Sequence, residues 1–477
     1  MDPQADAIRV SRGQAHPLGA HFLGVNAPLT QRGLTWAKAP LREALARLHV
    51  SHIRYPGGTI ANYWDWRTGW FNDDAPEVFK RRPKVAPYTL EDLYAAYRTT
   101  DAVPVFVLNV LTDTLPSQLE MLAAARQIGL PVKYVELGNE FYLDDPGYIA
   151  KYPTPEDYLA KMKTWVEGVR KVFPEARVAV VGAGPSRYAK QPDRLAGWNA
   201  KMLPGMNDAD ALILHFYLFS GFGGRQNQQG NWGTAQEQAD QYRMLQEPGG
   251  AAWMIAQPYL YLQNVWRDPL LAKHPIWVTE FNLFDRIGAV RGTWAHGLLV
   301  AGFLTEMVAQ PNIELVSYHA FAPNPMFTPL FFTADDYAGL TIRDVTTTPY
   351  ALTATGHVLA VFGEAMAGAT TVTPLVFTPE TVVQTRQNRT YPTLHGFVFD
   401  GPEASRVLLI NLSGEAQALD VSPFLEGALD YRILSADPAT YITAPESLIQ
   451  VRQRQSAVEG DSLILPPYAL LVGEAVR

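Results

Sequence analysis

Two glutamates, each at the end of a short apolar run, are the residues best placed to do chemistry. Glu140 ends the run that begins at Tyr134, and Glu280 ends the run that begins at Ile276. An apolar run of this length indicates a buried strand, so each carboxylate is predicted to lie at the edge of a sheet. Two neighbouring carboxyl groups push each other's pKa values apart, so one can keep a proton while the other stays ionised. Such a pair is the minimum that cleavage of a glycosidic bond requires.

Eight short apolar runs alternate with helical patterns between residues 20 and 321. This alternation predicts an α/β fold, a (β/α)8 TIM barrel. By strand count, Glu140 ends the fourth strand and Glu280 the seventh, so both would face the C-terminal mouth of one barrel. A doubly wound sheet is the competing layout, but no glycine-rich phosphate loop follows the first run. The predicted strands are residues 21–26, 52–55, 104–109, 134–140, 177–182, 211–217, 276–282 and 314–321.

The pattern changes past residue 365 from alternating helices and strands to strands alone. Short alternating segments there are separated by Gly, Pro, Asp and Ser. This spacing predicts a C-terminal antiparallel β-sandwich domain. We therefore expect a catalytic barrel over residues 15–360 and a β-sandwich over residues 365–477, which a strand within residues 5–14 could join.

Composition excludes several classes of function. The net charge of -8, without a long basic block, argues against a nucleic-acid partner. No apolar stretch reaches the roughly 20 residues of a membrane span, and the first residues lack the pattern of a signal peptide. We expect a cytoplasmic chain as written, with secretion after processing left open. The absence of cysteine and of metal-binding motifs predicts no metal and no cofactor, and the oligomeric state stays open.

Several short motifs resemble those of known glycosidases. Gly138-Asn139-Glu140 resembles the Asn-Glu signature of retaining glycoside hydrolases of clan A. The turn Arg54-Tyr55-Pro56-Gly57-Gly58 resembles that of α-L-arabinofuranosidases, and heparanase and β-glucuronidases have a related turn. His215 and Tyr217 resemble the His-x-Tyr strand end of arabinofuranosidases and β-xylosidases. The predicted C-terminal β-sandwich also fits the architecture of these families.

The resemblance implies a role for each matching residue. Glu140 would be the acid/base and Glu280 the nucleophile of a retaining mechanism. Asn139 would bind the sugar hydroxyl next to the anomeric carbon, and Arg54 would hold the nucleophile ionised through a charge-assisted hydrogen bond. Tyr217 would contact the nucleophile, and His215 would line the sugar subsite.

Two regions outside these motifs are candidates for substrate recognition. Trp64 and Trp66 lie in a tryptophan-rich loop after the second predicted strand. Aromatic faces stack on sugars, so this loop is a candidate sugar platform, although it could equally be a loop with its own core. Residues 219–250 form the least regular stretch and could be a lid or specificity loop. The segment after Glu280 ends in Phe284, where arabinofuranosidases usually have a tryptophan or an asparagine-rich segment.

These features together predict a glycosidase that needs no cofactor. The leading hypothesis is a retaining glycoside hydrolase that acts by double displacement on a carbohydrate substrate. The substrate would be an α-L-arabinofuranoside or a related pentoside or uronide, in a plant-type or other polysaccharide. Two alternatives stay open from the sequence: a non-catalytic carbohydrate-binding barrel, and a transglycosidase that passes the glycosyl group to a sugar acceptor.

Overall fold

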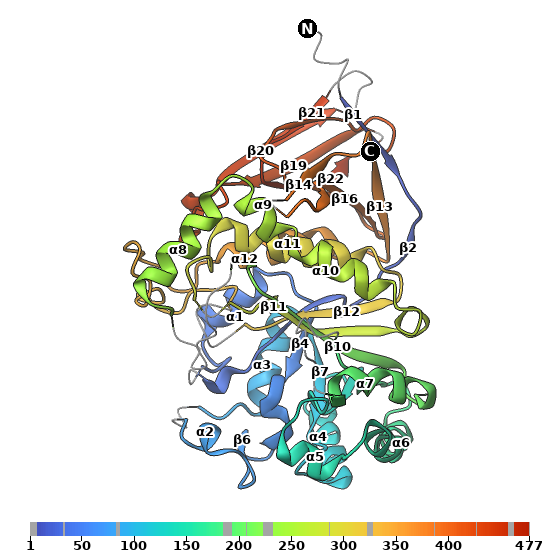
Figure 1. The fold of residues 1–477 in the computed structure, drawn as a ribbon. Helices are drawn as coiled ribbons and strands as arrows, with labels where there is room; N and C mark the ends of the chain where they lie inside the picture. Colours follow the sequence, from blue (N-terminus) through green and yellow to red (C-terminus); the bar gives the residue numbers. More distant parts are fainter. Residues whose placement is uncertain are drawn as a thin grey trace.

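The protein consists of a barrel joined to a C-terminal sheet, as the computed structural model shows (Figure 1). The structure describes residues 7–31, 34–82, 86–184, 193–206, 208–222, 232–285, 287–321, 328–385, 387–425, 427–456 and 462–476.

Eight strands close into the barrel in the order β3, β4, β7, β8, β9, β10, β11, β12, and each neighbouring pair is parallel. Their side chains are almost all buried, as expected where helices cover a parallel sheet. Each predicted run overlaps an observed strand, so the predicted (β/α)8 barrel is confirmed. The strands are β3 (Leu23–Asn26), β4 (His52–Tyr55), β7 (Val103–Leu108), β8 (Tyr134–Leu137), β9 (Arg177–Val181), β10 (Ala211–Leu218), β11 (Ile276–Leu283) and β12 (Ile313–Tyr318).

The helices follow local sequence signals. At the start of α6 the Thr154 side chain accepts a hydrogen bond from the Asp157 amide, and Asp157 caps Thr154 in return. This capping box, with Pro155 at the first position, fixes where the helix begins. The helices are α1 (Ala39–Ala46), α2 (Glu77–Lys80), α3 (Leu90–Thr100), α4 (Leu115–Gln127), α5 (Pro146–Lys151), α6 (Pro155–Val172), α7 (Asp193–Met202), α8 (Ala235–Gln246), α9 (Gly250–Ile255), α10 (Gln257–Trp266), α11 (Trp294–Val308) and α12 (Ala354–Met366).

The stretch 219–250 is more regular than its composition suggests. Residues 223–231 lie outside the described residues, but α8 occupies much of the remainder. Thr234 and Glu237 form a capping box at its start. Few apolar residues mark the helix, which is why its period is weak in the sequence.

The C-terminal sheet is largely antiparallel and confirms the predicted β-sandwich. The N-terminal strand β1 pairs with β13 and with β18, so the two ends of the chain share one sheet. Pro466 and Pro467, which lack an N–H, separate the last two strands of the chain, β21 and β22. The strands are β1 (Ile8–Arg12), β2 (His16–Pro17), β13 (Thr371–Thr378), β16 (Leu394–Asp400), β17 (Ser405–Asn411), β18 (Gln417–Asp420), β19 (Ala428–Ser435), β20 (Ile449–Ser456), β21 (Ser462–Leu465) and β22 (Ala469–Val476).

Helix α11 lies between the barrel and the C-terminal sheet, together with α12 (Figure 1). All fifteen residues of α11 are buried, as expected of a helix that is apolar all round. A loop of the C-terminal part caps its N-terminus, because the Trp294 and Ala295 amides each donate to a carbonyl 2.8 Å away, at Thr440 and Pro438. The C-terminal part thus supports the helix that follows β11. Among the described helices, none combines the length and the hydropathy that a membrane crossing requires.

Candidate active site

Glu280 lies inside β11, whereas the sequence predicted it at the end of a strand. The strand continues to Leu283, because the residues after Glu280 keep pairing with β10. The register of β11 shifts against both neighbours near Glu280, which stands opposite His215. Such a bulge re-aims a side chain. Glu280 therefore reaches the cavity at the barrel mouth from within a strand, with its side chain 5% exposed.

Glu140 lies three residues beyond the end of β8, so the predicted strand over residues 134–140 is too long. The chain leaves the strand at Gly138, whose φ is +88°, and a Cβ there would lie 2.2 Å from the Phe141 ring. Only glycine fits this position. Glu140 itself has φ +54°. Asn62 clamps the turn, because its side chain accepts from the Asn139 amide at 3.1 Å and donates to the Asn139 carbonyl at 2.9 Å.

The structure brings the two predicted carboxylates together. One oxygen of Glu140, one oxygen of Glu280 and a ring nitrogen of His215 all lie within 4.8 Å of one another. Carboxyl groups about 5 to 5.5 Å apart suit double displacement, whereas a pair that holds a water between them needs roughly 6.5 to 9.5 Å. The observed spacing belongs to the shorter class.

Arg54 is the buried cation of the site. Its Nη1 donates to Glu280 Oε1 at 2.7 Å, and its Nε donates to Glu136 Oε2 at 2.8 Å. Its remaining bonds go to the Oδ1 atoms of Asn139 at 2.8 Å and Asn26 at 3.0 Å. Arginine only donates, so the Asn139 oxygen must face it. Among the described residues, the buried Asn139 Nδ2 has no hydrogen-bond partner.

The groups around Glu280 keep it ionised. Burial opposes this, but His215, His319 and Arg54 and the hydroxyl of Tyr217, which donates to Oε2, hold the pKa of Glu280 well below its ordinary value. These contacts favour the ionised form of Glu280.

Glu140 has different partners. His215 Nδ1 lies 2.9 Å from Glu140 Oε1, and the Tyr142 hydroxyl donates to the same oxygen at 2.8 Å. The other nitrogen of His215 lies 3.2 Å from the Thr279 hydroxyl. Burial lowers the pKa of His215, but Glu280 and Glu140 outweigh burial and raise it. The imidazole therefore links the two carboxylates.

The two glutamates open onto a cavity of about 320 Å³ at the barrel mouth. Tyr217 also lines it, whereas Arg54, Asn139 and His215 are not among the lining residues. The lining residues are Pro28, Gly57, Gly58, Thr59, Ile60, Phe79, Glu140, Tyr217, Glu280, Phe284 and His319.

Of the two alternatives for the tryptophan-rich loop after β4, a sugar platform or a loop with its own core, the structure fits the second. Trp64 is 2% exposed, and its indole donates to the Tyr55 hydroxyl at 3.2 Å. Trp66 is partly buried under the Arg67 guanidinium, 4.5 Å from its ring centroid. Neither lines the cavity. These rings form the loop's own core, so they offer no free face to a sugar there.

Other residues of the site had weak signals in the sequence. Asn26 ends the first barrel strand as a polar residue in an apolar run, which could have indicated it. Tyr142 follows Glu140 by two residues, a spacing that carries no recognisable pattern. Asn62 belongs to a short 3-10 helix, Gly58–Tyr63, and only the fold brings it to Asn139.

The described residues contain one cluster with the donor types of a metal site, formed by Glu140, His215 and Glu280. The guanidinium of Arg54, 2.7 Å from Glu280, already supplies positive charge there. The hydrogen bonds of His215 and Tyr142 engage the facing oxygen of Glu140. These contacts suit a pair of acid–base groups better than a metal site.

Comparison with known proteins places the fold. No family model matches the chain, and no curated protein sequence matches it. Among solved structures, it is similar to a GH51 arabinofuranosidase from Xanthomonas axonopodis pv. citri, with a TM-score of 0.69 and 15% identity over 98% of this chain and all of the other. It is also similar to a family 51 α-L-arabinofuranosidase from Bifidobacterium longum, with a TM-score of 0.68 and 13% identity over 98% and 99%.

A third similar structure is a 4-O-α-L-rhamnosyl-β-D-glucuronidase from Fusarium oxysporum 12S, with a TM-score of 0.58 and 14% identity over 98% of this chain and all of the other. The chain therefore shares the fold of these proteins over nearly its whole length. The predicted resemblance to the arabinofuranosidase group is confirmed at the level of fold.

Proposed function

We propose that the protein is a retaining glycoside hydrolase. The observation that carries the proposal is the pair of carboxylates within 4.8 Å, of which Arg54 contacts only Glu280. An ionised carboxylate beside a second carboxyl group at this short spacing suits double displacement. The shared fold with arabinofuranosidases supports the proposal.

The first step forms a covalent intermediate. Glu280 attacks the anomeric carbon while the bond to the leaving oxygen breaks and Glu140 gives that oxygen its proton. Both hydrogen bonds of Glu140 fall on Oε1, so Oε2 is the oxygen that carries this proton. In the second step Glu140 takes a proton from water, whose oxygen attacks the anomeric carbon and releases Glu280. The resemblance gives Asn139 a hydrogen bond to the sugar hydroxyl next to the anomeric carbon. Its Nδ2, which has no partner among the described residues, is the atom that would donate once the substrate reaches it.

The first substrate to test is an α-L-arabinofuranoside, followed by a β-xyloside and a β-glucuronide. Two of the similar structures carry the name arabinofuranosidase, and one carries the name glucuronidase. The Arg54 turn and the pair His215 and Tyr217 point to the same group. A panel of 4-nitrophenyl glycosides measures which sugar is released.

The same panel tests the acid/base role of Glu140. In Glu140→Ala the loss of kcat/KM should be small for 4-nitrophenyl glycosides and large for alkyl glycosides, because a good leaving group needs little protonation. Glu120→Ala is the matched control. Glu120 lies on α4 and its side chain is 64% exposed, so this variant should behave as the unaltered protein. Equal losses on both kinds of substrate would contradict the assignment.

A further inference from the structure

The floor of the cavity, formed by Glu140, Glu280 and Tyr217, is polar, whereas its walls are apolar. Phe79 and Phe284 both line the cavity, and Ile60 and Pro28 add further apolar surface. Phe79 belongs to α2, after β4, and Phe284 follows the end of β11. Apolar side chains thus reach the cavity from segments after two barrel strands that are not neighbours.

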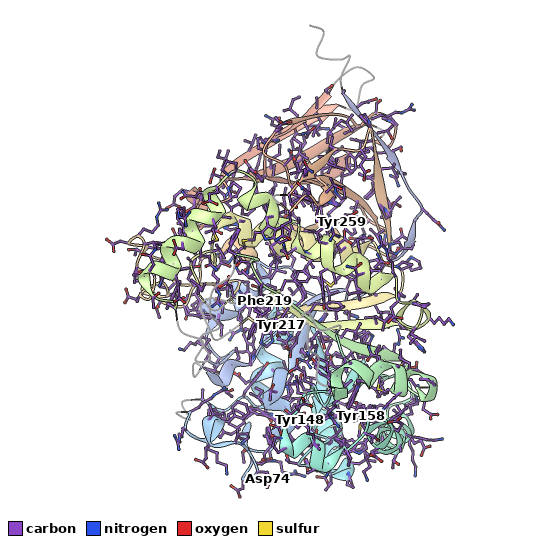
Figure 2. The ribbon with its side chains drawn as sticks, in the orientation of Figure 1. Asp74, Tyr148, Tyr158, Tyr217, Phe219 and Tyr259 are labelled. Atoms are coloured by element: carbon purple, nitrogen blue, oxygen red, sulfur yellow. The ribbon has the colours of Figure 1, made fainter. Side chains whose placement is uncertain are left out.

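Each phenylalanine is held by further aromatic rings. The Phe79 ring stacks on Phe71 with centroids 5.1 Å apart and an interplanar angle of 11°. The Phe284 ring meets Tyr217 edge-on at 5.6 Å and Phe219 at 6.1 Å. Figure 2 shows Tyr217 and Phe219 near each other at the end of β10. Rings packed in this way keep their positions, so both walls are preformed.

The polar side chains that line the cavity are concentrated at the reacting centre. Glu140, Glu280 and Tyr217 are joined to the hydrogen-bond network of the floor, and His319 Nδ1 lies 3.6 Å from Glu280 Oε2. Within the described part of the chain, this leaves Thr59 as the one hydroxyl or amide side chain of the lining away from that network. A second sugar carries several hydroxyl groups, and each one that loses water without a new partner costs free energy.

We propose that the leaving group of the natural substrate is an apolar aglycone, alkyl or aryl, and not a second sugar. This inference rests on the proposed glycosidase activity and names the class of substrate. One sugar ring occupies the carboxylate floor, and the aglycone lies between the Phe79 and Phe284 walls. Burial of the aglycone there removes apolar surface from water, which stabilises the bound substrate and the transition state.

The test compares aglycones that differ in apolar length alone. Methyl and hexyl glycosides of the sugar found in the 4-nitrophenyl panel have leaving alcohols of similar acidity, so their chemistry is matched. Each fully buried methylene group is worth about fourfold. We expect kcat/KM to rise at least about tenfold from methyl to hexyl, since part of the chain is buried. The hexyl glycoside should also exceed the disaccharide of the same sugar.

Variants of the walls connect this ratio to the structure. In Phe79→Ala and in Phe284→Ala the hexyl-to-methyl ratio should fall toward one. A ratio measured on one preparation does not depend on how much of the variant is folded. Ile449→Ala, at a side chain that is 66% exposed on the edge strand β20, should keep the original ratio.

The outcomes separate this inference from the proposed function. Turnover with a ratio near one, or a disaccharide preferred over the hexyl glycoside, overturns the apolar aglycone alone. No turnover of any 4-nitrophenyl glycoside overturns the glycosidase assignment and the aglycone with it. A ratio that rises with chain length and falls in both wall variants supports the inference.

Discussion

The floor and the walls of the cavity are built from opposite chemistry. Beneath the floor, the Arg54 guanidinium binds the buried carboxylates of Glu136 and Glu280 and orients Asn139. On the walls, Phe79 and Phe284 pack against other rings, and the Arg82 guanidinium lies over Phe79. We therefore propose that bond cleavage and choice of leaving group are carried by separate residues. Changes at Glu280 or Arg54 should slow every substrate alike, and changes at Glu140 should be largest for poor leaving groups. Changes to the walls should alter only the preference between leaving groups of similar acidity.

The largest effect is expected on the floor at Glu280. In Glu280→Ala, kcat/KM should fall by at least about 10⁴-fold for every glycoside, because no covalent intermediate can form. Added azide should restore turnover by taking the vacated space, and the glycosyl azide should have the anomeric configuration opposite to the substrate. Product analysis by NMR measures this. An azide product of retained configuration would assign Glu280 as the acid/base instead.

The next effect concerns Arg54. Arg54→Met leaves Glu136 and Glu280 buried without their cation, and breaking a buried pair in this way costs about 3 to 5 kcal/mol of unfolding free energy. The pKa of Glu280 should also rise, so the acid limb of the kcat/KM profile should move to higher pH. Chemical denaturation and a pH profile measure the two effects.

Arg67→Ala is the matched control for Arg54. Its pair with Glu120 is exposed, at 49% and 64%, and exposed pairs contribute about 0 to 1 kcal/mol. A loss in Arg54→Met no larger than in this control would show that the floor does not depend on its cation. An acid limb that does not move would show that Arg54 does not lower the pKa of Glu280.

A smaller effect is expected at His215, in how the unfolding free energy depends on pH. The raised pKa of His215 means that its contribution to stability is fully present below the unfolded value of about 6.5. That contribution is lost as pH rises through the higher folded pKa. The difference in unfolding free energy between the unaltered protein and His215→Asn should therefore shrink from pH 6 to pH 9. A difference that grows over this range would contradict a protonated His215 between the carboxylates.

The sequence predicts the floor better than the walls. The short runs that carry Arg54 and Glu280 form buried barrel strands, so counting the runs locates both residues on one barrel mouth. The turn after β8 escapes this reasoning, because Gly138 leaves the strand with a positive φ that an apolar pattern does not reveal. The sequence left open whether Trp64 is exposed or buried, because its burial depends on Tyr55 and Phe71, which only the folded loop brings around it. Phe79 reaches the cavity from a four-residue helix with no sequence period.

The central claim is that Glu280 becomes covalently bound to the sugar. A 2-fluoro glycoside with a good leaving group, of the sugar found in the panel, slows release of the intermediate more than its formation, so the glycosyl-enzyme can accumulate. Peptide mass spectrometry after proteolysis then locates the added sugar. The account predicts one sugar per chain, attached to Glu280. An adduct on Glu140, or an unlabelled protein that releases a product of inverted configuration, would contradict it.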